Sequence, residues 1–584
     1  MMRLAILFGV LLAASDGDRA PDFALKDLHG REHRLSALAG RPAVVLVFTG
    51  IECPRGRAAE ARLADLAARH PGVPFLAINP NRNESDERVA AHVRAGKWPL
   101  PVLRDVEGRV AAQYGVEVQP TAVVLDKDLR IRYRGAIDDH KNEEFVRSRY
   151  LKDALEAVLA GKEPPVKETK AEGCSVKSAA PAEGAAGPTY AKDVAPILNA
   201  HCVSCHRPGQ VGPFTLDDPE QASAWSKEIA GYAKRKLMPP WKPTTNAGAY
   251  YNERRLSDAE VETLAAWHAA GAPLGDLAKA PPKPPFDSGW MLGTPDLVLK
   301  AEGGYVVGPK GPDEYRCYVV QNPSDEDKWV VGVEYRPGNL SAVHHIIGYL
   351  DSSGASEKRD AADPQPGYRS NGSGPGILPS GSLAGWAPGN LPRMLPEGVA
   401  RRWRKGERIV LETHYHRTGR PETDDGAQIA LYFAKTPVKK RLGVHTIANF
   451  MLRIPAGADA HKVVATAIVP ENRHALDVMP HMHLLGRKVS VTATMPDGTV
   501  RDLVRIEDWD FNWQETYQFK EPVPLPRGTR IRVEAVYDNS LGNRNNPSNP
   551  PRDVRWGEET TDEMCIAFIH YTRDVEDLTK PKDE

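Results

Sequence analysis

The chain has 584 residues, which at the usual domain size corresponds to about three to five domains. Its 76 lysine and arginine residues balance 77 aspartate and glutamate residues for a net charge of -1, so there is no basic field for nucleic acid. Six cysteines in a chain of this length exclude a dense disulfide framework.

The N-terminus has the pattern of an export signal. Arg3 precedes an apolar run over residues 4–14, and small residues stand before Asp16. This arrangement predicts a signal peptide over residues 1–15 and a periplasmic or secreted protein. The run is shorter than a membrane span, and no later segment reaches that length, so we expect no stable membrane span. A buried N-terminal strand or an uncleaved anchor is the alternative interpretation.

Two segments rich in proline, glycine or alanine divide the rest of the chain. We interpret residues 161–187 as a linker and residues 276–287, which contain Ala-Pro-Pro-Lys-Pro-Pro, as a stiff linker. They separate segments over residues 18–160, 188–275 and 288–584.

The first segment alternates strand and helix patterns. Apolar residues 43–48 predict a buried strand, followed by Cys53 and a run of helix formers through residue 69. A second strand and a second helix follow, and a third strand opens at Pro120, so we expect an α/β domain built from βαβ units. From residue 20 onward the segment resembles thioredoxin-like redoxins, and Pro120 stands where that family carries a cis-proline beside its active site.

This resemblance makes Cys53 a candidate redox thiol. Gly56 replaces the second cysteine of the family's motif. Cys53 would lie at a helix N-terminus, where the helix dipole lowers a thiol pKa. Cys174 is a candidate resolving thiol from outside the domain, so we predict that the two form a redox pair. The alternative is a docking domain without redox activity.

The second segment contains a haem-attachment pattern. Cys202, Cys205 and His206 form C-x-x-C-H, in which two thiols bond the porphyrin and the histidine reaches the iron. Met238 follows a helical pattern, where a cytochrome c supplies its second axial ligand. Residues 188–275 resemble a small, all-α class I cytochrome c, which implies one covalent haem c. A structural cysteine pair or a zinc site is the alternative, and zinc is weakened because no second cysteine pair lies nearby.

The third segment is rich in short runs of valine, isoleucine, threonine and tyrosine, which predict two all-β sandwiches over residues 288–440 and 441–584. His481 and His483 are two residues apart, so a strand would point both to one face. His344 and His345 are adjacent, so they can share a metal only at a strand end or bulge, or through different ring nitrogens. Imidazole suits copper and zinc, and a methionine thioether favours Cu(I).

The order of these motifs carries a resemblance. A His-His pair, a single histidine, a His-x-His pair and a methionine occur in the order found in copper type II ascorbate-dependent monooxygenases. The resemblance implies two jelly-roll sandwiches and two copper ions. The expected ligands of the electron-transfer copper are His344, His345 and His414. The expected catalytic residues, which would bind the copper where O₂ reacts, are His481, His483 and Met564. His416 is not a ligand in this comparison.

The resemblance also implies an activity: hydroxylation of a C–H bond of a small organic substrate with O₂, fed by an external electron donor that is ascorbate-like or a redox protein. The attached haem is a candidate relay for these electrons. Met479, Ile566 and Phe568 replace the polar residues that grip a carboxylate in the peptide-amidating branch, so peptidylglycine is not the expected substrate. Two alternatives remain open: an exported haem and copper electron-transfer protein, and a thiol peroxidase without oxygenase activity.

Two cysteines remain for the third segment. The family's disulfide partners of Cys317 and Cys565 are absent from this sequence. We therefore expect both thiols to be buried and free, and the sandwiches to be stabilised by packing alone.

Overall fold

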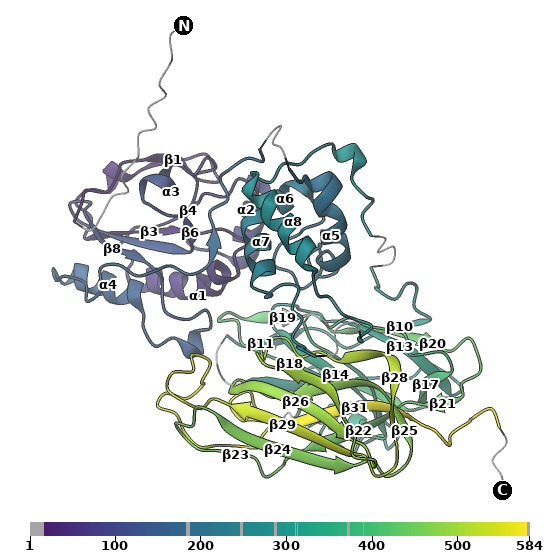
Figure 1. The fold of residues 1–584 in the computed structure, drawn as a ribbon. Coiled ribbons are helices and arrows are strands. Elements are labelled where there is room, and N and C mark those ends of the chain that lie inside the picture. The colour runs from purple at the N-terminus through teal and green to yellow at the C-terminus, as the bar shows by residue number, and fades with distance from the viewer. Residues whose placement is uncertain are drawn as a thin grey trace. The chain divides into compact units, whose positions relative to one another are not determined.

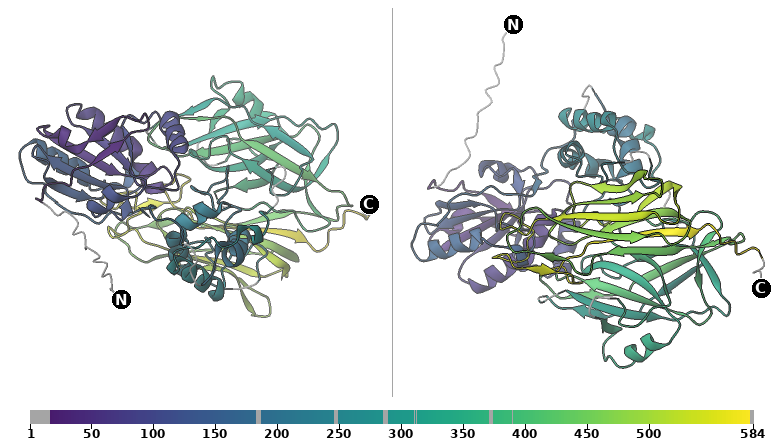
Figure 2. Two further views of the ribbon diagram at one scale, coloured as in Figure 1. Left: turned by 90° about the horizontal axis from the view of Figure 1, so that it is seen from above. Right: turned by 60° about the horizontal axis from the view of Figure 1, so that its bottom comes forward.

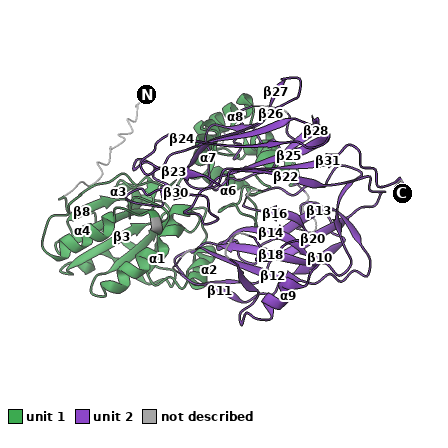
Figure 3. Ribbon diagram, turned by 90° about the horizontal axis from the view of Figure 1, so that it is seen from below, with its two compact units in different colours: residues 1–239, 256–283 green, residues 240–255, 284–584 purple. Residues whose placement is uncertain are grey.

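The fold is described from a computed structural model of the chain (Figure 1). The residues described are 17–182, 187–245, 249–284, 289–309, 311, 313–370, 374–388 and 390–580. The predicted signal peptide lies outside them. The chain divides into two compact units, Met1–Pro239 with Leu256–Lys283 and Pro240–Arg255 with Pro284–Glu584 (Figure 3). Within the described ranges, no helix has both the length and the apolarity needed to cross a bilayer.

The first unit begins with a thioredoxin-like domain, as predicted. Its sheet has the strand order β5-β4-β3-β7-β8, in which β3 is parallel to β4 and antiparallel to β7. All six residues of β3 are buried, because helices cover both faces of the sheet. The Gln119–Pro120 peptide bond is cis, which confirms the prediction for Pro120. The sheet strands are β3 Ala43–Phe48, β4 Phe75–Asn79, β5 Val102–Arg104, β7 Thr121–Asp126 and β8 Ile131–Gly135. The helices are α1 Pro54–Arg69, α2 Asp86–Gly96, α3 Arg109–Gln113 and α4 Tyr150–Leu159, and short pairs are formed by β1 Ala24–Lys26 with β2 Glu32–Arg34 and by β6 Val118–Gln119 with β9 Cys174–Ser175.

The remainder of the first unit is helical. After a π-helical turn at Tyr190–Val194, the chain forms α5 Ala195–His201, α6 Pro219–Ala224, α7 Ser226–Lys234 and α8 Asp258–Ala269. The start of α8 is defined by a capping box, in which Ser257 and Glu260 satisfy each other's backbone N–H groups. Trp267 of α8 is fully buried and donates a hydrogen bond to the carbonyl of Pro273.

The second unit is all-β, as predicted, and contains two sandwiches (Figure 2). In the first, the sheets β10-β20-β13-β17-β21 and β15-β12-β18-β14-β16 enclose one apolar core. In the second, the sheets β22-β31-β25-β28 and β24-β29-β26-β27 enclose another apolar core.

The strands of the first sandwich are β10 Leu297–Lys300, β11 Tyr305–Val307, β12 Glu314–Val320, β13 Lys328–Arg336, β14 Val343–Asp351, β15 Tyr368–Ser370, β16 Gly381–Trp386, β17 Val399–Trp403, β18 Arg408–Tyr415, β19 Glu422–Asp424, β20 Gln428–Phe433 and β21 Lys440–Arg441, with helix α9 Ala355–Asp360. Strands of the second are β22 Gly443–Ala448, β23 Arg453–Ile454, β24 His461–Ile468, β25 Arg473–His481, β26 Gly486–Thr494, β27 Val500–Ile506, β28 Tyr517–Leu525, β29 Arg530–Tyr537, β30 Val554–Arg555 and β31 Ile566–Arg573.

A strap formed by Pro240–Arg255 leaves the helical region and packs on the second sandwich. Pro243 bridges to Ile506 at the end of β27, and Tyr250 bridges to Phe519 in β28. Since β27 and β28 are edge strands of the two sheets, the strap covers both edges on one side. Residues 240–255 fall inside the segment 188–275 that the sequence predicts to be one domain, but they belong to the second compact unit.

The two cysteines without family partners lie where the sequence predicts. Cys317 and Cys565 are fully buried, and both are free thiols. The sandwiches are therefore held by packing.

Candidate metal centres and dithiol site

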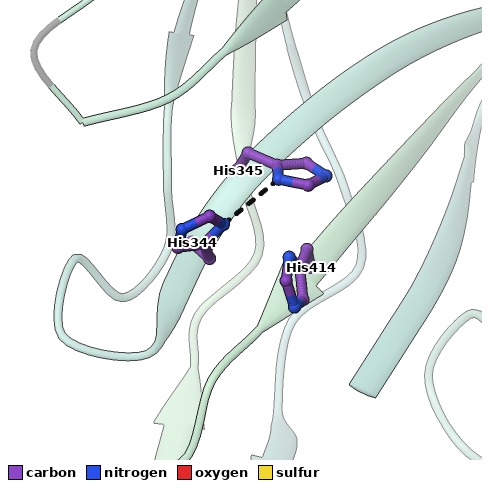
Figure 4. Close-up of side chains that lie close together, drawn as sticks. All are labelled: His344, His345 and His414. Carbon is purple, nitrogen blue, oxygen red and sulfur yellow. Dashed lines mark hydrogen bonds between the residues drawn. The ribbon is translucent and has the colours of Figure 1, made fainter. Parts of the chain in front are cut away.

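Three predicted ligands, His344, His345 and His414, come together in the first sandwich (Figure 4). One ring nitrogen from each lies within 4.8 Å of the others. His345 lies opposite His414, while Val343 lies opposite Tyr415, so two steps along β14 match one step along β18. His344 is thus the additional residue of a β-bulge, the irregularity that the sequence requires if both adjacent histidines are to serve one metal.

The surroundings of His414 fit a metal ligand. Its Nε2 donates to a carboxylate oxygen of Asp313 at 2.9 Å, and Thr560 donates to the same oxygen at 2.6 Å. Among the described residues, Nδ1 of His414 is buried and has no hydrogen-bond partner. Burial opposes ionisation of Asp313, but the hydrogen bonds from His414 and Thr560 prevail and lower the pKa of Asp313 to about 2. An oriented imidazole with one bare nitrogen is what a metal requires.

The other two histidines of this group are held neutral. Burial, followed by repulsion from neighbouring histidines, lowers the pKa of His344 and of His345 well below its ordinary value. Because a metal binds neutral imidazole, this environment favours binding over protonation.

A second pair of predicted ligands lies at the end of β25. The rings of His481 and His483 have centroids 5.1 Å apart. Nδ1 of His481 donates to the side-chain oxygen of Gln514, and Nδ1 of His483 donates to the carbonyl of Asp562 at 3.1 Å. Both rings therefore keep Nε2 available for a metal. Burial lowers the pKa of His481 to about 4 and that of His483 to about 3.

Met564 precedes β31 and is buried. It is tied to the segment of His483 by the carboxylate of Glu563. This carboxylate accepts hydrogen bonds from the backbone nitrogens of His483, Leu485 and Met564 at 2.8, 2.7 and 3.1 Å. Glu563 thus places the predicted thioether and the predicted imidazole on neighbouring segments.

The two predicted redox thiols are brought together in the first unit. Cys53 is the N-cap residue of α1, and its thiol donates to the carbonyl of Gln119 at 3.3 Å. Cys174 pairs with Gln119 across β9 and β6. Both are free and buried. A hydrogen bond from the Cys174 thiol, followed by backbone N–H groups of α1, outweighs the opposing effect of burial and lowers the pKa of Cys53 to about 7.

Helix α7 holds the strand that carries Cys174. The backbone nitrogen and hydroxyl of Ser175 donate to Glu228 at 2.6 and 2.7 Å, and Nζ of Lys177 donates to Glu228 at 2.8 Å. Nζ of Lys177 also lies 4.0 Å from the ring centroid of Trp225, whose indole N–H donates to Glu52 at 3.2 Å. The helical region therefore completes the surroundings of the dithiol.

The haem-attachment pattern follows α5. Cys202 and Cys205 are free, half-buried thiols. Nδ1 of His206 donates to the carbonyl of Phe214 at 3.1 Å, which leaves Nε2 for an iron. These features fit covalent haem attachment. Met238 follows α7 and is half-buried, and among the described residues its backbone nitrogen donates to the carbonyl of Tyr232 and not to the segment of His206.

The N-terminal domain is similar to known redox proteins. Residues 17–134 match the model of the AhpC/TSA family. The thiol-disulfide oxidoreductase ResA of Geobacillus thermodenitrificans (strain NG80-2) is 32% identical over 125 residues, covering 20% of this chain and 68% of the relative. Through this domain the chain belongs to the AhpC/TSA family. A solved structure is also similar in sequence: the crystal structure of the hypothetical protein SMc02350 from Sinorhizobium meliloti 1021 has 31% sequence identity to this chain and a TM-score of 0.27. The match covers 29% of this chain and 97% of that chain.

The all-β unit resembles a different group. Residues 457–580 match the C-terminal domain of the copper type II ascorbate-dependent monooxygenases. Dopamine beta-hydroxylase of Equus caballus is 26% identical over 293 residues. The match covers 46% of this chain and 45% of the hydroxylase, so the chain spans about half the length of that relative.

Sequence motifs did not identify the residues that orient these ligands. Gln514 belongs to no motif, and Glu563 stands out only as the neighbour of Met564, because the roles of both residues depend on segments that meet only in the folded chain. Asp313 gave no signal of its role either, because its partner His414 lies far along the chain. Glu228 and Trp225 gave none.

Proposed function

We propose that this protein is a copper-dependent monooxygenase that hydroxylates a C–H bond of a small organic substrate. The observation that carries the proposal is the group His344, His345 and His414, in which His414 keeps a bare, buried nitrogen. The resemblance of the all-β unit to copper monooxygenases supports it. The balanced reaction consumes the substrate, O₂, two electrons and two protons, and yields the alcohol and water.

The six proposed ligands divide into two centres. His344, His345 and His414 would hold an electron-transfer copper, and His481, His483 and Met564 would hold the copper of the oxygen reaction. When bound, the two ions would each supply one of the two electrons that O₂ reduction needs beyond those of the C–H bond. The chain's own task is to keep the imidazoles neutral and oriented, through Asp313, Gln514 and the carbonyl of Asp562.

The surface beside His481 favours an apolar substrate. Met479 lies on the same face of β25 as His481, and its cross-strand partner is Phe568. Both side chains are half-buried. They offer contact to a hydrocarbon or aromatic group and no partner for a carboxylate.

The helical region is proposed to supply electrons. Cys202 and Cys205 would attach a haem c, with His206 and Met238 as axial ligands, in the cytochrome c domain predicted over residues 188–275, of which the strap Pro240–Arg255 belongs to the second unit. The remaining proposed domains are 18–160, 288–440 and 441–584. Export through a signal at residues 1–15 fits this assignment, because such haem attachment occurs outside the bacterial cytoplasm.

The dithiol is proposed to be a separate redox couple. Cys53 and Cys174 would form a disulfide, releasing two electrons and two protons to an oxidised thiol compound, which is reduced to two thiols. Loss of free thiols from the reduced protein on treatment with oxidised glutathione tests this pair. Both thiols remaining alkylatable would reject it.

Metal and haem analysis tests the main proposal. We expect two coppers and one haem per chain, and incorporation of ¹⁸O from ¹⁸O₂ into a product of a substrate screen. Met564→Ala should abolish O₂ consumption while haem reduction survives. Chains that bind no copper would reject the oxygenase. Copper and haem with neither O₂ consumption nor product would favour an electron-transfer protein, and peroxide turnover by Cys53 without copper would favour a thiol peroxidase.

A further inference from the structure

One aromatic side chain touches both histidine groups. Phe511 lies in the loop between β27 and β28 of the second sandwich. Its ring stacks on His344, with centroids 5.0 Å apart and planes 14° apart. It also meets His483 edge-on, with centroids 5.9 Å apart and planes 83° apart. No sequence motif marks this residue.

The loop around Phe511 is anchored on the second histidine group. The side-chain amide of Gln514 donates to the carbonyl of Phe511 at 2.9 Å, while its oxygen accepts from His481. The indole N–H of Trp509 donates to the carbonyl of His483 at 3.2 Å. The backbone at Phe511 is therefore held by Gln514, which also accepts from His481, and the same loop is bonded to the backbone of His483.

Core packing does not account for this position. The apolar core of the second sandwich includes Trp509 and Tyr517 from the two ends of the loop, but it does not include Phe511. Phe511 stays half-buried, with its ring between imidazoles. A phenylalanine that only filled space would be better placed in that core.

We propose that Phe511 is a positioning residue that sets the separation of the two metal centres and provides the contact across which they exchange an electron. This rests on the proposed two-copper function. With both coppers bound, one electron would leave the centre of His344 and one would reach the centre of His483, and no bond would form or break. The parallel ring face and the edge contact give a continuous path from His344 through the phenyl ring to His483.

The test compares Phe511→Leu and Phe511→Met with Phe450→Leu in copper-loaded full-length chains. Phe450 is 66% exposed and contacts Trp556, so it is a matched phenylalanine without contact to either group. Copper content is measured first. Pulsed electron paramagnetic resonance of the Cu(II) form then gives the separation of the two centres, and single-turnover mixing of the reduced form with O₂ gives the rate at which the second copper is oxidised.

We expect each Phe511 variant to keep two coppers, to broaden the distribution of separations, and to slow oxidation of the second copper by about tenfold, the effect of a modest rise in an activation barrier. Phe511→Tyr keeps the ring and should therefore keep the separation and the oxidation rate of the unsubstituted chain. Phe450→Leu should change neither quantity. Unchanged separation and rate in both Phe511 variants would overturn the proposal. Fewer than two coppers in the unsubstituted chain would instead reject the two-copper function, and with it this role for Phe511.

Discussion

At three of the proposed metal ligands, the ring nitrogen that would not bind the metal donates a hydrogen bond to an acceptor. Nε2 of His414 donates to Asp313, and Nδ1 of His483 donates to a backbone carbonyl. Nδ1 of His481 donates to Gln514. Because these acceptors can only receive a proton, each imidazole is fixed in one tautomer, with its other nitrogen bare. The chain thus orients its ligands before any metal arrives.

The first prediction concerns Asp313. Replacing it in Asp313→Ala frees the His414 ring to rotate and to change tautomer. Loss of a hydrogen-bond partner of this kind lowers metal affinity by about 10–100-fold. The affinity of the first centre for copper should therefore fall by this factor, while the affinity of the second centre should not change. Titration with a competing chelator measures both affinities. Asp459→Ala, at an exposed aspartate, is the control, and an equal loss at both centres would contradict the assignment.

The second prediction is a pH dependence. The hydrogen bond from Cys174 is the largest cause that lowers the pKa of Cys53 to about 7 from an ordinary 9.0. In the reduced protein, the ultraviolet absorbance of the thiolate should rise as pH increases through about 7 and disappear below it. Cys174→Ala should move this step to higher pH. A step that stays in place after that substitution would show that Cys174 does not stabilise the thiolate.

Sequence reasoning at this scale succeeds where spacing alone carries the chemistry. The pair His481 and His483 is recognisable because a two-residue spacing predicts one strand face. The two rings do lie close together, although β25 ends at His481 and His483 lies beyond it. Asp313 and Phe511 are not recognisable, because each acts on a histidine from a distant part of the chain. Only the folded β-strands bring these partners within contact distance.

At the scale of single elements, two short features position the redox residues. The bulge at His344 lets adjacent histidines serve one centre. From the adjacency of the two histidines, the sequence left a bulge, a strand end and the use of different ring nitrogens as alternatives. The two-residue strand β9 was not anticipated, because it lies in a segment interpreted as a linker. A strand of that length has no periodicity to detect, and its position depends on β6 and on Glu228 of α7.

The third prediction tests this support. Glu228→Ala leaves Lys177, which is 4% exposed, without its carboxylate partner. Breaking a buried ion pair costs about 3–5 kcal/mol, so strand β9 should detach and the Cys53–Cys174 disulfide should form more slowly. Hydrogen exchange of residues 173–177 and the rate of thiol loss with oxidised glutathione measure the two effects. Glu220→Ala, at an exposed glutamate of α6, should change neither. Unaltered exchange in Glu228→Ala would place the support of β9 elsewhere.

At the scale of the whole molecule, the strap Pro240–Arg255 joins a helical region to a β-sandwich that lies far along the chain. Its residues contribute to the core of the second sandwich through Trp241 and Tyr250, and Arg254 forms a buried ion pair with Glu515. In the sequence alone, proximity along the chain is the only guide to where the strap belongs, and it predicts the helical segment. Nothing in residues 240–255 alone indicates that their partners lie more than 250 positions later, near Leu503 and Phe519.

The last prediction asks whether the strap is part of the sandwich. Tyr250 is 1% exposed, and its hydroxyl donates to the carbonyl of Leu503 at 2.7 Å. Tyr250→Ala removes a large buried ring and leaves a cavity, so it should lower the free energy of unfolding of the second unit by about 3–5 kcal/mol. Tyr250→Phe keeps the ring and should cost only about 1 kcal/mol for the lost hydrogen bond. Because the ring packs against β28, the larger loss should appear in the unfolding of the β-unit and leave the redoxin domain unchanged, as followed by hydrogen exchange of both regions in denaturant. Equal, small losses in the two variants would mean that the strap lies on the sandwich without stabilising it.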